Sequence, residues 1–232
     1  MDYMRSLSFI FNDKNWPVKV LILAVLMLFV ITSPIATGYC LKVLRNVSNG
    51  DETLPEFDYG NMFIDGLRVG VGILLYMLPF LMIMVISGVI LFLGGDSNSG
   101  VVAMGGILMG IIIGLLMLFL LMAISPAVMI HATDDHSWGF MFGFNKIFSI
   151  IIRNTGSYIS IILVAFLINF VLSFVGGFIP IIGTAFASTV GMLASSHLYG
   201  QYVRQNGIFM GTMINNYAGN DAYNNNDDRY NY

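Results

Sequence analysis

The strongest constraint in this sequence is a series of five long apolar runs that charged residues scarcely interrupt. A helix needs about 20 mainly apolar residues to cross a bilayer, and each run reaches that length. The expected spans are residues 18–41, 69–94, 101–130, 156–176 and 179–203. Because backbone polar groups in lipid must pair within their own segment, such runs predict helices. We therefore expect an all-α, polytopic transmembrane helix bundle with about five spans.

Composition narrows the class of protein further. The chain is 57% hydrophobic and only 10% charged, whereas a soluble domain has roughly 25% charged residues. A formal net charge of -3 argues against nucleic acid as a partner. Cys40 is the single cysteine and cannot form an intrachain disulfide. No motif indicates a cofactor.

The chain divides into three parts. Residues 1–17 are an N-terminal flank, and residues 18–204 form a single transmembrane domain. Residues 205–232 are rich in Asn and Tyr with little to bury, so we expect a disordered C-terminal tail. The polar stretch GGDSNSG at 94–100 should join the second and third spans as a hairpin.

We expect a multi-pass protein of the cell (plasma) membrane. The distribution of its basic residues does not decide its orientation in that membrane. Cytoplasmic loops are enriched in Lys and Arg. One side of the expected topology carries Lys42, Arg45, Arg68, Lys146, Arg153 and Arg204, and the other carries Arg5, Lys14 and Lys19. The totals favour cytoplasmic connectors, but the flank of the first span favours the opposite orientation.

A short motif that occurs twice in the chain suggests an internal duplication. ITSPIA at 31–36 and AISPAV at 123–128 both place Ser-Pro near the end of a long apolar run. The copies are two spans apart, which predicts parallel repeats. The alternative is that Ser-Pro is simply a common kink pair in membrane helices.

The connector after the first span has an amphipathic pattern. On a helix starting near Pro55, four polar residues recur at spacings of three and four: Asp58, Asn61, Asp65 and Arg68. We expect this stripe to face water, with an Asp65–Arg68 pair along it. The opposite face is apolar, as in a helix lying in the membrane interface. Just upstream, Lys42 and Arg45 form a similar basic stripe.

The second connector, SWGFMFGFNKIFSIIIRN at 137–154, is richer in aromatic residues. Lys146, Ser149 and Arg153 form a narrow polar stripe, and Phe rings surround it. Aromatic rings suit the headgroup level of a membrane, and long basic side chains can reach lipid phosphates. Both connectors therefore predict interfacial amphipathic helices.

Residues 38–79 resemble the signature of an uncharacterised bacterial and archaeal membrane family, domain of unknown function 4013. The matching positions are Gly38, Tyr39, Arg45, Gly50, Leu54, Pro55, Glu56, Phe57, Asp58, Asp65, Gly66, Tyr76 and Pro79. HLYGQYVR at 197–204 resembles the closing helix of the family, and Gly139 departs from its usual alanine. The resemblance covers most of residues 20–204. It implies a polytopic membrane protein and no established activity.

Polar residues inside the expected spans are candidate functional residues, because each is costly in lipid. His197 and Gln201 share a helix face in the last span, and Asn169 lies in the fourth. They could form a polar cluster that contacts a substrate. The alternative is that they make interhelical hydrogen bonds.

Two further patterns are structural. Small residues recur every fourth position in two helix-packing seams: Gly106, Gly110 and Gly114, and Ala187, Gly191 and Ser195. His131 and Asp135 lie one turn apart, but no third ligand is evident, so no metal is predicted.

Three functions remain open. The favoured one is a non-enzymatic component that binds membrane lipids, or a membrane or cytoplasmic protein partner, through its connectors. The second is a small-solute transporter or transporter subunit. The third is an intramembrane enzyme acting at lipid headgroups through Asp58, Asp65 and Arg68. No catalytic constellation is recognisable, since GDSNS at 95–99 lacks the last glycine of a nucleophile elbow. The sequence does not indicate an oligomeric state.

Overall fold

The computed structural model describes residues 1–93, 100–135, 137–179 and 181–208. These residues form helices and no strand, which confirms the all-α prediction. The elements are α1 Arg5–Ser8, η1 Phe9–Asn12, α2 Trp16–Leu28, α3 Ser33–Ser48, α4 Tyr59–Leu93, α5 Gly100–Asp134, η2 Trp138–Phe142, α6 Phe144–Arg153, α7 Thr155–Gly176 and α8 Ile182–Asn206. The expected turn at 94–99, Pro180 and the tail from 209 onward lie outside the described residues.

Three of the helices are long and apolar enough to cross a membrane. They are Tyr59–Val89 within α4, Met104–Asp134 within α5, and Thr155–Gly176, which is α7. The fifth expected span became α8, which has 25 residues and is therefore about 37 Å long. α8 is less apolar because much of it is buried against protein. α8 ends at Asn206, one residue beyond the start of the expected tail.

The first expected span is broken. α2 ends at Leu28 and α3 begins at Ser33. The Thr32 hydroxyl donates a 2.7 Å hydrogen bond to the Leu26 carbonyl and so satisfies the end of α2. Pro34 lies in the first turn of α3, where a missing N–H costs nothing. This Ser-Pro pair therefore begins a helix, and the expectation that it ends one is wrong.

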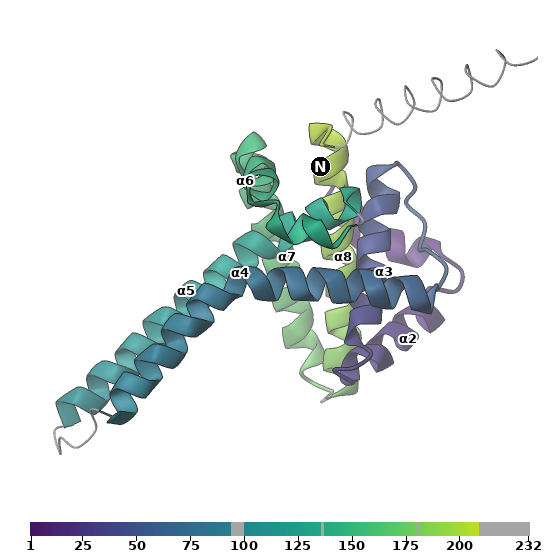
Figure 1. The fold of residues 1–232 in the computed structure, drawn as a ribbon. Coiled ribbons are helices and arrows are strands. Elements are labelled where there is room, and N and C mark those ends of the chain that lie inside the picture. The colour runs from purple at the N-terminus through teal and green to yellow at the C-terminus, as the bar shows by residue number, and fades with distance from the viewer. Residues whose placement is uncertain (94–99, 136, 180, 209–232) are drawn as a thin grey trace, which may run out of the picture.

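The second Ser-Pro pair occupies a different place, because Pro126 lies inside α5. The two pairs are thus not structurally equivalent. Pro79 likewise lies inside α4 and cannot donate the usual helical hydrogen bond. Figure 1 shows α4 changing direction along its length: its first part crosses in front of α3, and its later part runs beside α5.

Two helical hairpins organise the molecule. α4 and α5 project from the rest as a long pair (Figure 1). α7 and α8 form the second pair, and α8 also packs against α2 and α3. α8 is therefore the central helix, which explains why so few of its polar side chains face outward.

The α3–α4 crossing depends on two glycines. A side chain at Gly66 would collide with the Pro34 carbonyl, and one at Gly38 would collide with the Met62 carbonyl. The two backbones are therefore in direct contact. Only glycine permits so close an approach, as in other small-residue helix crossings.

The LPEFD segment before α4 has no regular secondary structure and is held by side chains from neighbouring helices. Lys19 donates to the Leu54 carbonyl at 3.1 Å, and the Tyr39 hydroxyl donates to the Pro55 carbonyl at 2.9 Å. The Lys42 ammonium donates to the next carbonyl, that of Glu56, at 3.2 Å. The connector pattern had predicted a helix that begins near Pro55. α4 begins at Tyr59 instead, because the preceding segment is held by these hydrogen bonds.

The N-terminal flank is part of the folded structure. The Asp2 backbone N–H donates to Gln201 Oε1 at 2.8 Å, and Gln201 Nε2 donates to the Asp2 carbonyl at 2.9 Å. Phe9 and Ile10 are buried. We refer to residues 1–15 as the N-terminal strap, because they run over α8 and are fixed at both ends.

Candidate functional site

The predicted polar stripe of α4 does not face water along its whole length. Arg68 is only 3% exposed. Its guanidinium donates to the carbonyls of Ala132 and Asp135 at 3.3 and 2.7 Å, and it lies 5.4 Å from the Phe140 ring centroid. Arg68 thus satisfies carbonyls at the C-terminal end of α5, where a cation is favourable. The prediction of a solvent-facing Arg68 is wrong, because this helix end packs on the stripe.

Asp65 is shared between two arginines. Its carboxylate accepts a 2.9 Å hydrogen bond from Arg68, so the expected pair forms. Arg45 lies 3.7 Å from the other carboxylate oxygen. Arg45 therefore belongs to a charge network that joins α3, α4 and α5.

The other end of the stripe stays on the surface. Asn61 Nδ2 donates to the Asp58 carboxylate at 2.7 Å, and both residues are exposed. The hydrogen bonds from Asn61 lower the pKa of Asp58. These contacts are local to the first turn of α4.

The predicted intramembrane cluster is divided between two places. His197 Nδ1 lies 3.1 Å from Gln201 Nε2, and its ring stacks on Phe9 with centroids 4.4 Å apart. These residues hold the N-terminal strap. Asn169 instead donates to the Ser195 hydroxyl at 2.9 Å and to its own helix at the Ala165 carbonyl.

The two small-residue seams also differ. A side chain at Gly191 would collide with Asn169, and one at Gly176 would meet Ala187, so Ala187, Gly191 and Ser195 lie at the α7–α8 contact. In α5, Gly106 is buried. At Gly110 and Gly114, in contrast, an added side-chain carbon would have no described atom within 4 Å.

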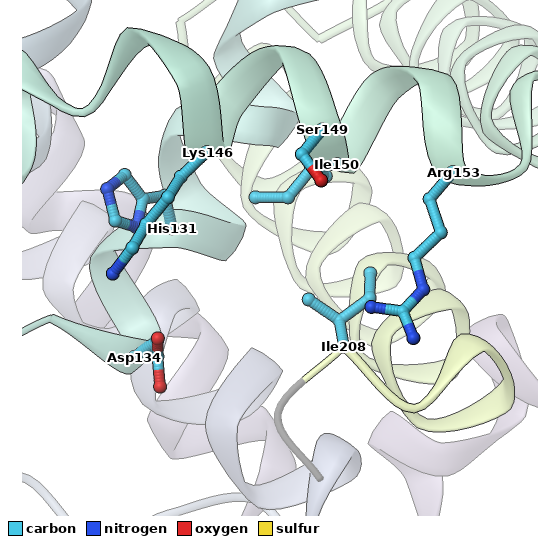
Figure 2. A pocket seen from close by; sticks show the side chains of 7 residues that line it. All are labelled: His131, Asp134, Lys146, Ser149, Ile150, Arg153 and Ile208. Carbon is cyan, nitrogen blue, oxygen red and sulfur yellow. The ribbon is translucent and has the colours of Figure 1, made fainter. Parts of the chain in front are cut away.

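The remaining candidates, Lys146 and Arg153, line one pocket (Figure 2). We call it the α6 pocket. It has a volume of about 240 Å³ and is lined by His131, Asp134, Lys146, Ser149, Ile150, Arg153 and Ile208. Figure 2 shows Lys146, Ser149 and Arg153 on α6, with Asp134 opposite Lys146 and Arg153 toward the other end.

Four polar side chains of the α6 pocket have no partner among the described residues. Within the part of the chain that the structure describes, no hydrogen bond or ion pair involves the side chains of Asp134, Lys146, Ser149 or Arg153. Two cations therefore face one carboxylate across a cavity. Such an arrangement has capacity to bind an anion through charge-assisted hydrogen bonds.

Two further hollows adjoin the α6 pocket. One, of about 570 Å³, shares Ser149 and Arg153 and extends over Phe148 and Ile152. The other, of about 270 Å³, shares His131 and Lys146 and is lined mainly by η2 and the start of α6. Asp135 borders the second hollow, and a hydrogen bond with Ser137 lowers the pKa of its carboxyl group.

Neighbouring elements fix α6 in place. Ile147 and Ile150 are buried, and the Tyr202 hydroxyl of α8 donates to the Ile150 carbonyl at 2.8 Å. Phe148, by contrast, is 62% exposed, and Ile152 is 67% exposed. α6 thus presents an apolar row outward and a basic row toward the pocket.

Sequence reasoning identified the α6 side of the pocket and missed its opposite wall. Lys146, Ser149 and Arg153 were predicted from their spacing, whereas Asp134 and Ile208 were not. The only signal was the polar group HATDD at 131–135, in which His131 and Asp135 had suggested a metal site without a third ligand. Asp134 is the residue that joins His131 in the α6 pocket. Among the described residues, no group of three potential metal ligands occurs.

Fold and site together define a class: an all-helical protein with several helices apolar enough for a membrane and a basic pocket beside an exposed aromatic helix. Residues 20–181 match the family DUF4013, described as a protein of unknown function. The chain belongs to this family, as its sequence signature had indicated. No curated protein and no solved structure matches it.

Proposed function

We propose that the chain is a multi-pass protein of the cell membrane that binds the phosphate headgroup of a membrane lipid in the α6 pocket. The observation that carries the proposal is the pair Lys146 and Arg153, which face one cavity without a carboxylate in ion-pair distance among the described residues. Arg and Lys are the usual ligands of phosphate groups. The proposal assigns no chemical step to the site.

The arrangement of helices supports a membrane location for this pocket. We assign α4, α5 and α7 as spans, α8 as a fourth span shielded by protein, and the broken pair α2–α3 as the fifth apolar segment. The α2–α3 turn is strongly exposed and apolar, with Val30 88% exposed. In Figure 1, α6 lies at the opposite end of the molecule from that turn, which suits a helix at one membrane surface.

The exposed side of α6 suits the lipid interface. Phe144, Phe148 and Ile152 form an outward apolar row, and aromatic rings favour the headgroup level of a bilayer. A lipid held there would keep its acyl chains beside this row while its phosphate reached the basic row. Binding would therefore combine apolar burial with charge pairing.

The transport alternative, which also drew on the repeated Ser-Pro pairs and on kinked helices, has less support from its polar residues. The polar residues on which it depended, His197, Gln201 and Asn169, make hydrogen bonds within the chain. They hold helices and the N-terminal strap together. No described feature marks a solute pathway through them.

The test compares lipid retention by the full chain in nanodiscs that contain acidic phospholipid. A Lys146→Gln/Arg153→Gln double variant should retain at least about tenfold less acidic phospholipid by native mass spectrometry, because the charge-assisted contact of Arg153 and the positive charge of Lys146 are both lost. Lys14→Gln is the matched control, since Lys14 is exposed and far from the pocket in sequence. Equal retention by all three proteins would contradict the proposal.

A competition arm distinguishes lipid from a soluble anion. Inorganic phosphate and glycerol phosphate should displace the lipid poorly, because neither gains apolar contacts with Phe148 and Ile152. Displacement at equal concentrations would identify a free phosphate compound as the ligand instead. Capture of a protein at the same face, with lipid retention unchanged by the double variant, would favour a protein partner.

A further inference from the structure

The α6 pocket is asymmetric, and this asymmetry bears on which lipid it would take. We infer that the pocket selects phospholipids whose headgroup carries a hydrogen-bond donor beyond the phosphate, either a hydroxyl or an amine. The phosphate binds at Arg153 and Ser149, and the donor binds to the Asp134 carboxylate. This inference rests on the proposed function and adds the headgroup chemistry to it.

The phosphate position follows from the residues that the two cavities share. Ser149 and Arg153 line both the α6 pocket and the adjoining hollow over Phe148 and Ile152. They lie four residues apart on α6 and so share a helix face. In a phospholipid, the phosphate joins the acyl-bearing glycerol to the headgroup. It therefore belongs where the apolar hollow meets the polar pocket.

The end of the α6 pocket that Lys146 and Asp134 line has no net positive charge with which to bind a second phosphate. There, Lys146 lies opposite Asp134 (Figure 2), so one cation is matched by one carboxylate. His131 completes this end. A second dianionic group would be repelled by Asp134, whereas at the Arg153 end no described carboxylate lines the cavity.

The Asp134 carboxylate favours a lipid headgroup that carries a hydrogen-bond donor. An ionised carboxylate can only accept hydrogen bonds, and no described group donates to the side chain of Asp134. Its position at the end of α5 is fixed by Arg68, which holds the carbonyls of Ala132 and Asp135 on either side. A lipid hydroxyl or ammonium group would satisfy the carboxylate without disturbing that cap.

The cavity has room for such a headgroup. One water molecule needs a cavity of roughly 10–15 Å³, and the α6 pocket has about 240 Å³. That exceeds what one phosphate group requires. A glycerol or ethanolamine headgroup could therefore extend from Arg153 toward Asp134.

The test uses the full chain in nanodiscs that present phosphatidylglycerol, phosphatidylethanolamine or phosphatidate, the last of which has no group beyond its phosphate. Wild type should retain the first two in preference to phosphatidate. Asp134→Asn should reduce their retention about tenfold, because a charge-assisted acceptor is lost, and should leave phosphatidate equal or higher. Asp51→Asn, which alters an exposed carboxylate outside the pocket, is the control.

The outcomes separate this inference from the proposed function. Retention that falls in the Lys146→Gln/Arg153→Gln double variant but is the same for all three lipids in Asp134→Asn would overturn the donor selectivity alone. Retention that is unchanged in both variants would overturn the lipid site itself. A general loss of folded Asp134→Asn protein is checked with Asp134→Glu, which keeps the acceptor and should keep the preference for donor-bearing lipids. Failure of Asp134→Glu to show that preference would count against the inference.

Discussion

Arg68 connects three elements through its buried guanidinium. It pairs with Asp65 on its own helix, lies against Phe140 of η2, and donates to two carbonyls at the end of α5. Removing one partner of a buried charge network leaves the remaining groups unpaired, which costs about 3–5 kcal/mol. Arg68 therefore supports the wall of the α6 pocket without lining it.

We predict that Arg68→Gln lowers the free energy of unfolding by about 3 kcal/mol, or roughly 6–12 °C in Tm. Thermal unfolding of the purified chain in detergent measures the effect. Lys14→Gln should be nearly neutral, because exposed isolated charges contribute little. A Tm for Arg68→Gln within about 1 °C of wild type would show that the network does not stabilise the fold.

The pairing of Asp13 with Lys19 gives the N-terminal strap a pH dependence. The Lys19 ammonium donates to Asp13 at 2.9 Å, and this hydrogen bond lowers the pKa of Asp13 below its ordinary value of about 3.8. The folded state thus favours the carboxylate. Its stabilisation is present above the unfolded pKa and is lost as pH falls through the lower folded pKa.

Lowering the pH from 5 to 3 should accelerate amide hydrogen exchange in residues 13–20, after correction for intrinsic rates. Asp13→Asn should show faster exchange already at pH 5 and a smaller further change. Glu52 and Glu56 also form ion pairs with Arg5 and Lys19, so the difference in exchange between wild type and Asp13→Asn is the quantity that tests Asp13. Identical pH profiles would remove Asp13 from the account.

Among the elements, the crossing of α3 and α4 is the contact that tolerates least change. Gly38 and Gly66 let the two backbones meet, and both belong to the motif that the family resemblance identified. The LPEFD segment between these helices is likewise held by Lys19, Tyr39 and Lys42. The family signature in this region is therefore explained by packing.

Gly66→Ala should destabilise the protein by about 3 kcal/mol or more, because the added carbon would meet the Pro34 backbone, which cannot move aside as a side chain can. Gly70→Ala on the same helix is the matched control, since no described atom lies within 4 Å of the added carbon. It should be stabilising by up to about 1 kcal/mol. Equal Tm values for the two variants would contradict the crossing.

The N-terminal strap is the element about which the sequence carried the least structural information. Residues 1–17 were predicted as an N-terminal flank, because they contain no long apolar run. Nothing in their sequence shows that Phe9 and Ile10 are buried in the folded protein. Gln201 on α8 supplies the missing anchor through two hydrogen bonds to Asp2. An interaction across 199 residues leaves no local pattern to read.

Gln201→Leu should release the start of the strap while leaving the helices intact. We expect cleavage by a nonspecific protease within residues 1–8 to become about 30-fold faster, since two hydrogen bonds of about 1 kcal/mol each are lost. Circular dichroism should remain unchanged. An unaltered cleavage rate would show that other contacts suffice to hold the strap.

At the scale of the whole molecule, composition alone predicted α4, α5 and α7 as long apolar helices. It did not predict the break at 29–32, because the run stays apolar through Ile31 and the break depends on the cap at Thr32. Half of the α6 pocket was likewise predictable from spacing along one helix. Its other wall comes from the end of α5, and only tertiary packing brings Asp134 there.

The central claim is that a lipid phosphate binds beside α6. The most direct measurement is photo-crosslinking of the full chain in nanodiscs to a phospholipid with a diazirine at the start of one acyl chain, followed by peptide mapping. The strongest labelling should fall within residues 144–153, be lost in the Lys146→Gln/Arg153→Gln double variant and persist in Lys14→Gln. Labelling spread evenly over the exposed apolar surface of α4, α5 and α7, and unchanged in the double variant, would contradict it.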